Sequence, residues 1–96
     1  MLVVVSIDLT AADLAAFDRY ESKALALLVA QGGTVLHRIR SLDRTQETHI
    51  LQFPNEDIFT HFMACDDRAV LHPDWLACGA KAALYIGKDL PTPRRA

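Results

Sequence analysis

The order of two repeating patterns constrains the fold of this chain more than any other feature. A run rich in valine and isoleucine, Leu2 to Leu9, precedes a long segment with apolar residues at helical spacing. Two more β-type runs, a second helical region and a final apolar run follow. Residues of a strand alternate between its two faces, whereas residues three and four apart share one face of a helix. The sequence therefore predicts the order strand, helix, strand, strand, helix, strand.

The first helix is predicted to begin after Thr10, its N-cap, and to end near Gln31, before the pair Gly32-Gly33. A hydroxyl side chain commonly caps the start of a helix, and glycine tolerates the left-handed conformation that often ends one. The apolar face is predicted to carry Leu14, Phe17, Ala24, Leu25 and Leu28. The charged residues between them are predicted to face solvent: Asp13, Asp18, Arg19, Glu21 and Lys23.

The second half of the chain predicts a hairpin, a broken helix and a last strand. Strands are expected over about Thr34 to Leu42 and Glu47 to Phe53, joined by a four-residue loop, with Arg40 opposite His49. Pro54 ends the second of these strands, and Asn55 is expected to cap the next helix. That helix is predicted to break at Asp66-Asp67, continue from Arg68 to Cys78 and end at Gly79, before a strand over Ala82 to Gly87.

Two βαβ units without an inserted domain predict a ferredoxin-like α+β fold, a four-stranded antiparallel sheet with its helices on one face. Residues 1–88 are expected to form this single domain, and residues 89–96 a C-terminal tail. The other face of the sheet is expected to be mixed in character, with Leu2, Val4, Ser6 and Asp8, together with Arg38, Arg40, His49 and Tyr85. A partly apolar open face predicts a partner, and we expect a homodimer in which two sheets face each other.

Charge and composition narrow the classes of function. Ten basic and twelve acidic residues are interleaved along the chain, for a net charge of −2, so the basic stripe typical of nucleic-acid binding is missing. The apolar run at the start follows no basic segment and is too short to span a membrane, which predicts a cytoplasmic protein. Cys65 and Cys78 lack the spacing of a metal site, and we expect neither a metal nor a cofactor.

Four stretches of the sequence carry structural motifs: a strand end, a helix cap, a helix break and a helix stop. They are Phe53-Pro54-Asn55-Glu56-Asp57-Ile58-Phe59, Asp66-Asp67-Arg68-Ala69, Trp75-Leu76-Ala77-Cys78-Gly79-Ala80, and Tyr20 followed by Gly32-Gly33 and a strand with Arg38. Together they resemble small dimeric α+β-barrel proteins related to the antibiotic-biosynthesis-type monooxygenases, and the resemblance covers nearly the whole chain. It implies a dimer whose sheets enclose a small cavity. Relatives of this type include enzymes that oxygenate aromatic polyketides without a cofactor and others that degrade haem.

Six residues are the candidates for a ligand site. Arg38, Arg40 and His49 could form a cationic cluster on the hairpin with Asp8 nearby, and arginine binds carboxylates in a fork. The alternative is a solvated strand end or an ion pair between subunits. Tyr20 and Trp75 could line the mouth of a cavity, although such aromatics commonly pack in a core or a dimer interface.

Two hypotheses of function follow. The first is a protein that binds a small organic molecule in a cavity between sheet and helices. The alternative is a cofactor-independent monooxygenase or isomerase acting on a small aromatic or polyketide-like substrate, which the family resemblance alone implies. His61 and Cys65 share a helix face with Asp57 one turn earlier, but packing explains this trio better than a metal site does.

Overall fold

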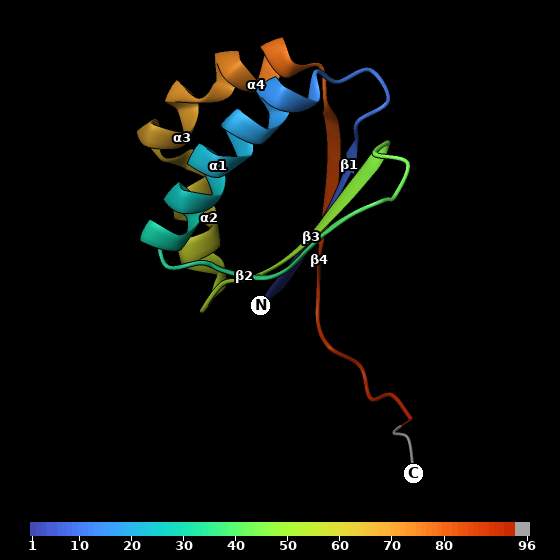
Figure 1. Ribbon diagram of the computed structural model, residues 1–96. Helices are drawn as coiled ribbons and strands as arrows, with labels where there is room; N and C mark the ends of the chain where they lie inside the picture. The colour runs from blue at the N-terminus through green and yellow to red at the C-terminus, as the bar shows by residue number, and fades with distance from the viewer. Residues whose placement is uncertain (94–96) are drawn as a thin grey trace.

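The computed structural model describes residues 1–93 and confirms the predicted order of elements (Figure 1). Three helical pieces lie where the second helix was expected. The elements are β1 (Leu2–Asp8), α1 (Leu14–Ala30), β2 (Thr34–Arg40), β3 (Gln46–Gln52), α2 (Glu56–Ala64), α3 (Asp66–Val70), α4 (His72–Cys78) and β4 (Lys81–Gly87). Residues 88–93 follow β4 without helix or strand, and residues 94–96 of the predicted tail lie outside the described part.

The four strands form one antiparallel sheet in the order β2-β3-β1-β4. The helices gather on one side of this sheet, and its other side is bare (Figure 1). This is the predicted ferredoxin-like α+β arrangement. In the part of the chain that the structure describes, none of the helices combines the length and apolarity that a membrane crossing needs.

Helix α1 begins later than the sequence suggested. Asp13, and not Thr10, is the N-cap, and its carboxylate accepts a hydrogen bond from the Ala16 backbone N–H. Thr10 instead donates from its backbone N–H and its hydroxyl to the Asp8 carboxylate, and this turn carries the chain out of β1. The local bond to Asp8 satisfies Thr10 before the helix starts, which explains why the capping role passes to Asp13.

The second helical region breaks twice, at Cys65 and at Leu71. The predicted cap is confirmed, since the Asn55 side-chain oxygen accepts from the Ile58 backbone N–H. The acidic pair Asp66-Asp67 was expected to interrupt the helix but begins α3, where negative charge suits the positive end of the helix dipole. Gly79 ends α4 with φ of 78° and would place any Cβ 2.8 Å from the Ala11 carbonyl oxygen.

The hairpin register differs from the prediction by two residues. Arg40 lies opposite Glu47, and Arg38 lies opposite His49. The loop is longer than expected, because the Asp43 carboxylate accepts hydrogen bonds from Ser41 and Thr45 and Arg44 adopts φ of 65°. A shift of two keeps these side chains on one face, but a bulge between Val35 and His37 turns Val35 toward the core and leaves Leu36 exposed.

Arg38, Arg40 and His49 lie on the helix-covered face of the sheet, so their expected place on the open face is wrong. His49 pairs with Val5 and Glu47 pairs with Ile7, and Val5 and Ile7 both pack beneath the helices. Alternation along the hairpin alone does not determine which of its faces joins the odd positions of β1, because that depends on how β3 pairs with β1. Leu2, Val4, Ser6, Asp8 and Tyr85 do share the open face, as predicted.

The apolar core divides into two clusters along the sheet. One contains Phe53, Leu28 and Val3, and the other contains Phe17, Ile7 and Cys78. Between them the core is polar, because α1 places Glu21 between Phe17 and Leu28, and β3 places Glu47 and His49 there. On the helix-facing side of β4, Leu84 and Ile86 remain 45% and 50% exposed, so the helical layer leaves this edge of the sheet uncovered.

Candidate functional site

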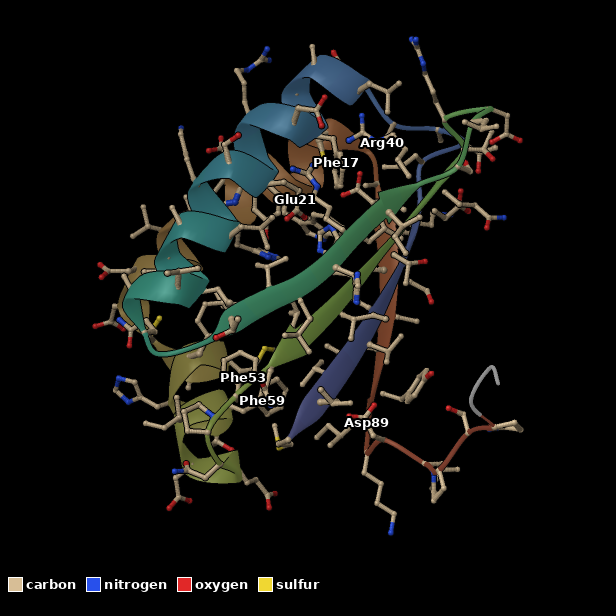
Figure 2. All side chains as sticks on the ribbon, turned by 60° about the horizontal axis from the view of Figure 1, so that its bottom comes forward. Phe17, Glu21, Arg40, Phe53, Phe59 and Asp89 are labelled. Atoms are coloured by element: carbon tan, nitrogen blue, oxygen red, sulfur yellow. The ribbon has the colours of Figure 1, made fainter. Side chains whose placement is uncertain are left out.

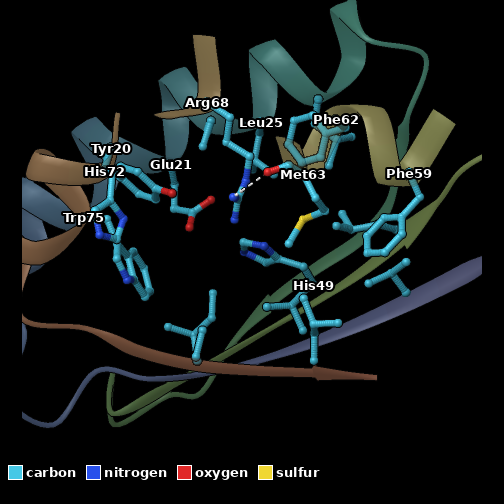
Figure 3. Close-up of a pocket in the computed structure, with 18 of the residues that line it drawn as sticks. Tyr20, Glu21, Leu25, His49, Phe59, Phe62, Met63, Arg68, His72 and Trp75 are labelled. Atoms are coloured by element: carbon cyan, nitrogen blue, oxygen red, sulfur yellow. Dashed lines mark hydrogen bonds between the residues drawn. The ribbon is translucent and has the colours of Figure 1, made fainter. Parts of the chain in front are cut away.

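A cavity of about 880 Å³ lies between the helical layer and the sheet, beside the uncovered edge at β4 (Figure 3). Its walls come from α1, α2, α3, α4 and three of the strands. Most of the wall is apolar, and the aromatic and sulfur-bearing side chains that line it are Tyr20, Phe53, Phe59, Phe62, Trp75, Met63 and Cys65. Its charged or titratable lining residues also include Glu21, His49, Arg68, His72 and Lys81.

Tyr20 and Trp75 form the wall at one end of the cavity. Their rings lie 5.2 Å apart between centroids, tilted by 47°. This pair joins α1 to α4, and both rings border the cavity (Figure 3). Burial raises the pKa of the Tyr20 hydroxyl, which therefore keeps its proton at neutral pH. The two rings offer aromatic surface to a bound molecule.

Glu47 lies behind the polar part of the cavity wall, with a side chain that is 1% exposed, and organises the charged residues around it. Its carboxylate accepts hydrogen bonds from Arg40 Nε at 2.8 Å and Arg38 Nε at 3.0 Å, and it lies 2.6 Å from His49 Nε2. Arg40 also donates to Asp18 of α1 at 2.5 Å, and its guanidinium lies 5.8 Å from the centre of the Phe17 ring (Figure 2). We call these five charged or titratable residues, Asp18, Arg38, Arg40, Glu47 and His49, the ion cluster.

The protonation states of the ion cluster follow from burial and hydrogen bonding. Burial would raise the pKa of Glu47, but hydrogen bonds from His49, Arg40 and Arg38 outweigh it and hold that pKa below its ordinary value. Burial lowers the pKa of His49, so its imidazole is neutral near pH 7. A neutral ring has one N–H, which at Nε2 donates to the Glu47 carboxylate. His49 Nδ1 is then a hydrogen-bond acceptor.

Glu21 is buried in the cavity wall, where the residue is 6% exposed, and it is not part of the ion cluster. Burial raises the pKa of its carboxyl group to about 7, against the opposing influence of Arg38 and with the help of Glu47 and Asp18. Figure 3 shows its carboxyl group pointing into the cavity, toward the region of Arg68 and His49. A carboxyl group with such a pKa can take up or release a proton at neutral pH.

Arg68 brings a positive charge into the same space from α3. Its guanidinium donates to the Met63 carbonyl at 3.2 Å and lies 5.7 Å from the centre of the Phe62 ring. These contacts hold the side chain against α2 (Figure 3). The cavity therefore contains groups of both signs within a mostly aromatic wall.

The structure brings together three of the six predicted site residues. Tyr20, His49 and Trp75 line the cavity. Arg38 and Arg40 stand behind the wall in the ion cluster and do not line the cavity. Asp8 lies at the end of β1 on the open face, where hydrogen bonds from Thr10 hold its pKa low. A role in binding a ligand stays a prediction for all six residues.

Sequence reasoning missed Glu21 and Arg68. Glu21 was assigned to the solvent face of α1, which is wrong, because it is four residues from both Phe17 and Leu25 and shares their face. That spacing was the available signal. Arg68 had no comparable signal, since its position depends on the turn at Cys65 between α2 and α3. Within residues 1–93, no three His, Cys, Asp or Glu side chains are grouped to hold a metal ion.

Comparison with known proteins identifies the fold. No protein-family model and no curated protein matches the chain. Among solved structures, SnoaB from Streptomyces nogalater, described as a cofactor-independent oxygenase, superposes with a TM-score of 0.75 at 15% identity over 93% of each chain. A Caulobacter crescentus protein, provisionally described as an antibiotic biosynthesis monooxygenase, gives 0.72 at 15% identity, covering 92% of this chain and 89% of that one.

A NIPSNAP domain protein from Burkholderia xenovorans, described as uncharacterized, is also similar, with a TM-score of 0.63 at 11% identity over 97% of this chain and all of that one. The structural neighbours thus include proteins of the antibiotic-biosynthesis monooxygenase type, in agreement with the resemblance seen in the sequence. At these identities the likeness establishes the shared fold alone.

The geometry of the ion cluster predicts that Glu47 contributes more to the free energy of unfolding than the half-exposed Asp18 does. Replacing Glu47 with Gln leaves two guanidinium groups facing a neutral amide, and we expect it to lower the free energy of unfolding by about 3 kcal/mol. The matched variant Asp18→Asn removes a half-exposed carboxylate and should cost less than about 1 kcal/mol. Urea denaturation of both variants measures the difference. Equal losses in the two would contradict the central place of Glu47.

Glu21 predicts an unusual dependence of stability on pH. The pKa of Glu21 is about 7 in the folded protein, whereas the ordinary value of a glutamate, expected in the unfolded chain, is 4.5. Between these pH values the folded state therefore holds a proton that the unfolded chain has released. Stability from this residue therefore falls as the pH rises from about 4.5 to about 7, whereas the contribution of Glu47 is lost only in more acidic solution. The charged groups that act on the Glu21 carboxyl group are Arg38, Glu47 and Asp18, and Tyr20 is close to it. The other titratable groups on the same cavity wall are His49, Cys65, Arg68, His72 and Lys81.

The variant Glu21→Gln removes the free-energy cost of ionising a buried carboxyl group. At about pH 8 it should be more stable than the wild type by up to about 3 kcal/mol, and at about pH 5 the difference should shrink. Urea denaturation at the two pH values, with the exposed Glu56→Gln as the control, checks the sign. A Glu21→Gln protein that is less stable than the wild type at about pH 8 would show that the carboxylate is stabilised where it lies.

Proposed function

We propose that this protein binds a small, uncharged organic molecule with an aromatic or alicyclic body in the cavity between its sheet and helices. The observation that carries the proposal is the cavity itself, with a volume of about 880 Å³ and a wall of aromatic side chains broken by a few polar groups. Binding sites for small molecules commonly have volumes of roughly 300–1,000 Å³ and this kind of lining. The exposed edge at Leu84 and Ile86 offers a route of entry.

A second candidate is a cofactor-independent monooxygenase or isomerase acting on an aromatic or polyketide-like substrate. SnoaB, which shares the fold, is described as a cofactor-independent oxygenase, although fold alone does not determine activity. The observation in this chain that favours an enzyme is Glu21, since proton transfer is most effective from a group whose pKa lies near the working pH. Turnover that survives Glu21→Gln unchanged would count against this candidate.

Filling the cavity tests the binding proposal. Ala24 lines the cavity from α1, whereas Ala26 on the same helix faces solvent. Replacing Ala24 with Phe should weaken binding of 2-methoxynaphthalene at least about tenfold, because the new ring occupies the space that the ligand needs, and Ala26→Phe should have no effect. Isothermal titration calorimetry measures both affinities. Equal affinities, or no binding by the wild type to this or other uncharged aromatic compounds, would contradict the proposal.

We also propose that the open face of the sheet mediates self-association. The register aligns His37, Ile50, Val4 and Tyr85 in one row across all four strands, and Ile39 lies in the next row. Tyr85 and Ile39 are 61% and 56% exposed in the single chain. Such apolar groups on a flat sheet are typical of a surface that a partner covers, and a second copy of the same face is the simplest partner.

Light scattering at micromolar concentration tests this self-association. The expected mass is twice the 10.6 kDa of one chain. Ile39→Asp should shift the protein to the monomer, because a carboxylate in the interface would lose its hydration. Val29→Asp, which places the same charge on the exposed side of α1, should leave the dimer intact. A wild-type mass of 10.6 kDa would contradict the proposal.

A further inference from the structure

Glu21 is a buried carboxyl group whose hydrogen-bonding capacity is unused. Within residues 1–93 its side chain makes neither a hydrogen bond nor an ion pair, although the residue is more than nine-tenths buried. No side-chain oxygen or nitrogen that is fully sealed from solvent lacks a partner in this part of the chain. The carboxyl oxygens of Glu21 must therefore border the open space of the cavity, where a bound molecule could reach them.

Within residues 1–93, none of the donors near Glu21 is directed at its carboxyl group. Arg38 and Arg40 donate to Glu47 and Asp18, and Arg68 donates to the Met63 carbonyl. His49 directs its one N–H at Glu47, so the free ring nitrogen is a second acceptor. Glu21 and His49 Nδ1 are thus acceptors without a donor within residues 1–93, although Tyr20, Arg68, Trp75 and Lys81 bring further O–H or N–H groups to the cavity wall. A ligand that donates a hydrogen bond would supply the missing partner.

The charges around Glu21 disfavour ionic ligands. A ligand carboxylate at this position would lie next to the Glu21 carboxyl group, and a ligand ammonium group would share the cavity with Arg68 and Lys81. An uncharged ligand with an O–H group avoids both costs. Phenols and enols combine such a hydroxyl with a flat apolar body, which matches the aromatic wall of Tyr20 and Trp75.

We propose that Glu21 accepts a hydrogen bond from the ring hydroxyl of an uncharged phenol- or enol-class ligand whose apolar body packs against Trp75 and Met63. This assignment rests on the proposed function, because it names the ligand class of the same cavity (Figure 3). The acceptor is strongest when Glu21 is ionised, since a hydrogen bond to a charged group is stronger than one between neutral groups. The preference for a hydroxyl should therefore grow as the pH rises through about 7.

The test compares 2-naphthol with its methyl ether, 2-methoxynaphthalene, which has nearly the same shape but no donor. Affinities are measured by isothermal titration calorimetry from about pH 5.5 to about pH 8.5, a range in which the naphthol stays uncharged. We expect the wild type to prefer 2-naphthol about tenfold at the alkaline end and much less at the acid end. The ether should bind equally well or more weakly as the pH rises, because Glu21 becomes charged.

Variants isolate the role of the carboxylate. In Glu21→Gln the preference should fall to about twofold or less and should no longer depend on pH, while Glu56→Gln should behave as the wild type. The Glu21→Gln variant should fold, because it removes a buried carboxylate that is costly to ionise. The urea denaturation described above checks that it does.

The outcomes separate the two proposals. Equal affinity of the wild type for both compounds at every pH overturns the role of Glu21 and leaves cavity binding standing. A pH-dependent preference that persists unchanged in Glu21→Gln also overturns it. Binding of neither compound contradicts the proposed function and this inference together.

Discussion

Glu47 places a negative charge inside the protein, and the surrounding elements are arranged to hold it. Two arginines of β2 and the His49 imidazole bind its carboxylate, and Arg40 reaches on to Asp18 of α1. The ion cluster thereby fixes the hairpin register, draws α1 onto the β2 side of the sheet and sets the tautomer of His49. Because a buried carboxylate without these partners would be very costly, the cluster restricts the arrangements that the chain can adopt.

The asymmetry of this packing explains where the cavity forms. The helices are held over β2, β3 and β1, and the helix-facing side chains of β4 are left half exposed. Apolar clusters close both ends of the core, so the uncovered volume lies in the middle, at the level of Glu21 and His49. The same ion cluster that stabilises the hairpin stands behind the cavity wall and contributes His49 to it. Burial at this level raises the pKa of Glu21 to about 7, with Arg38 opposing the shift and Glu47 and Asp18 adding to it.

Hydrophobic periodicity and the residues that begin and end helices were sufficient to predict the fold, but they predicted the site less well. Strand and helix patterns, the Asn55 cap and the Gly79 stop predicted the element order and most boundaries. The face occupied by Arg38, Arg40 and His49 was predicted wrongly, since it depends on how β3 pairs with β1, a contact far apart in sequence. Glu21 was misassigned because its charge was weighed above its position, four residues from Phe17 and from Leu25. Tyr20, His49 and Trp75 do reach the cavity.

The central claim is that the helix-covered face of the sheet, and not its open face, receives the ligand. Methyl chemical shifts measured by NMR during titration with 2-methoxynaphthalene test this claim directly. Met63 and Leu84 border the cavity, whereas Ile39 and Ile50 lie on the open face. We predict saturable shifts at Met63 and Leu84 with Ile39 and Ile50 unchanged. Saturable shifts at Ile39 and Ile50 with Met63 and Leu84 unchanged would contradict the account.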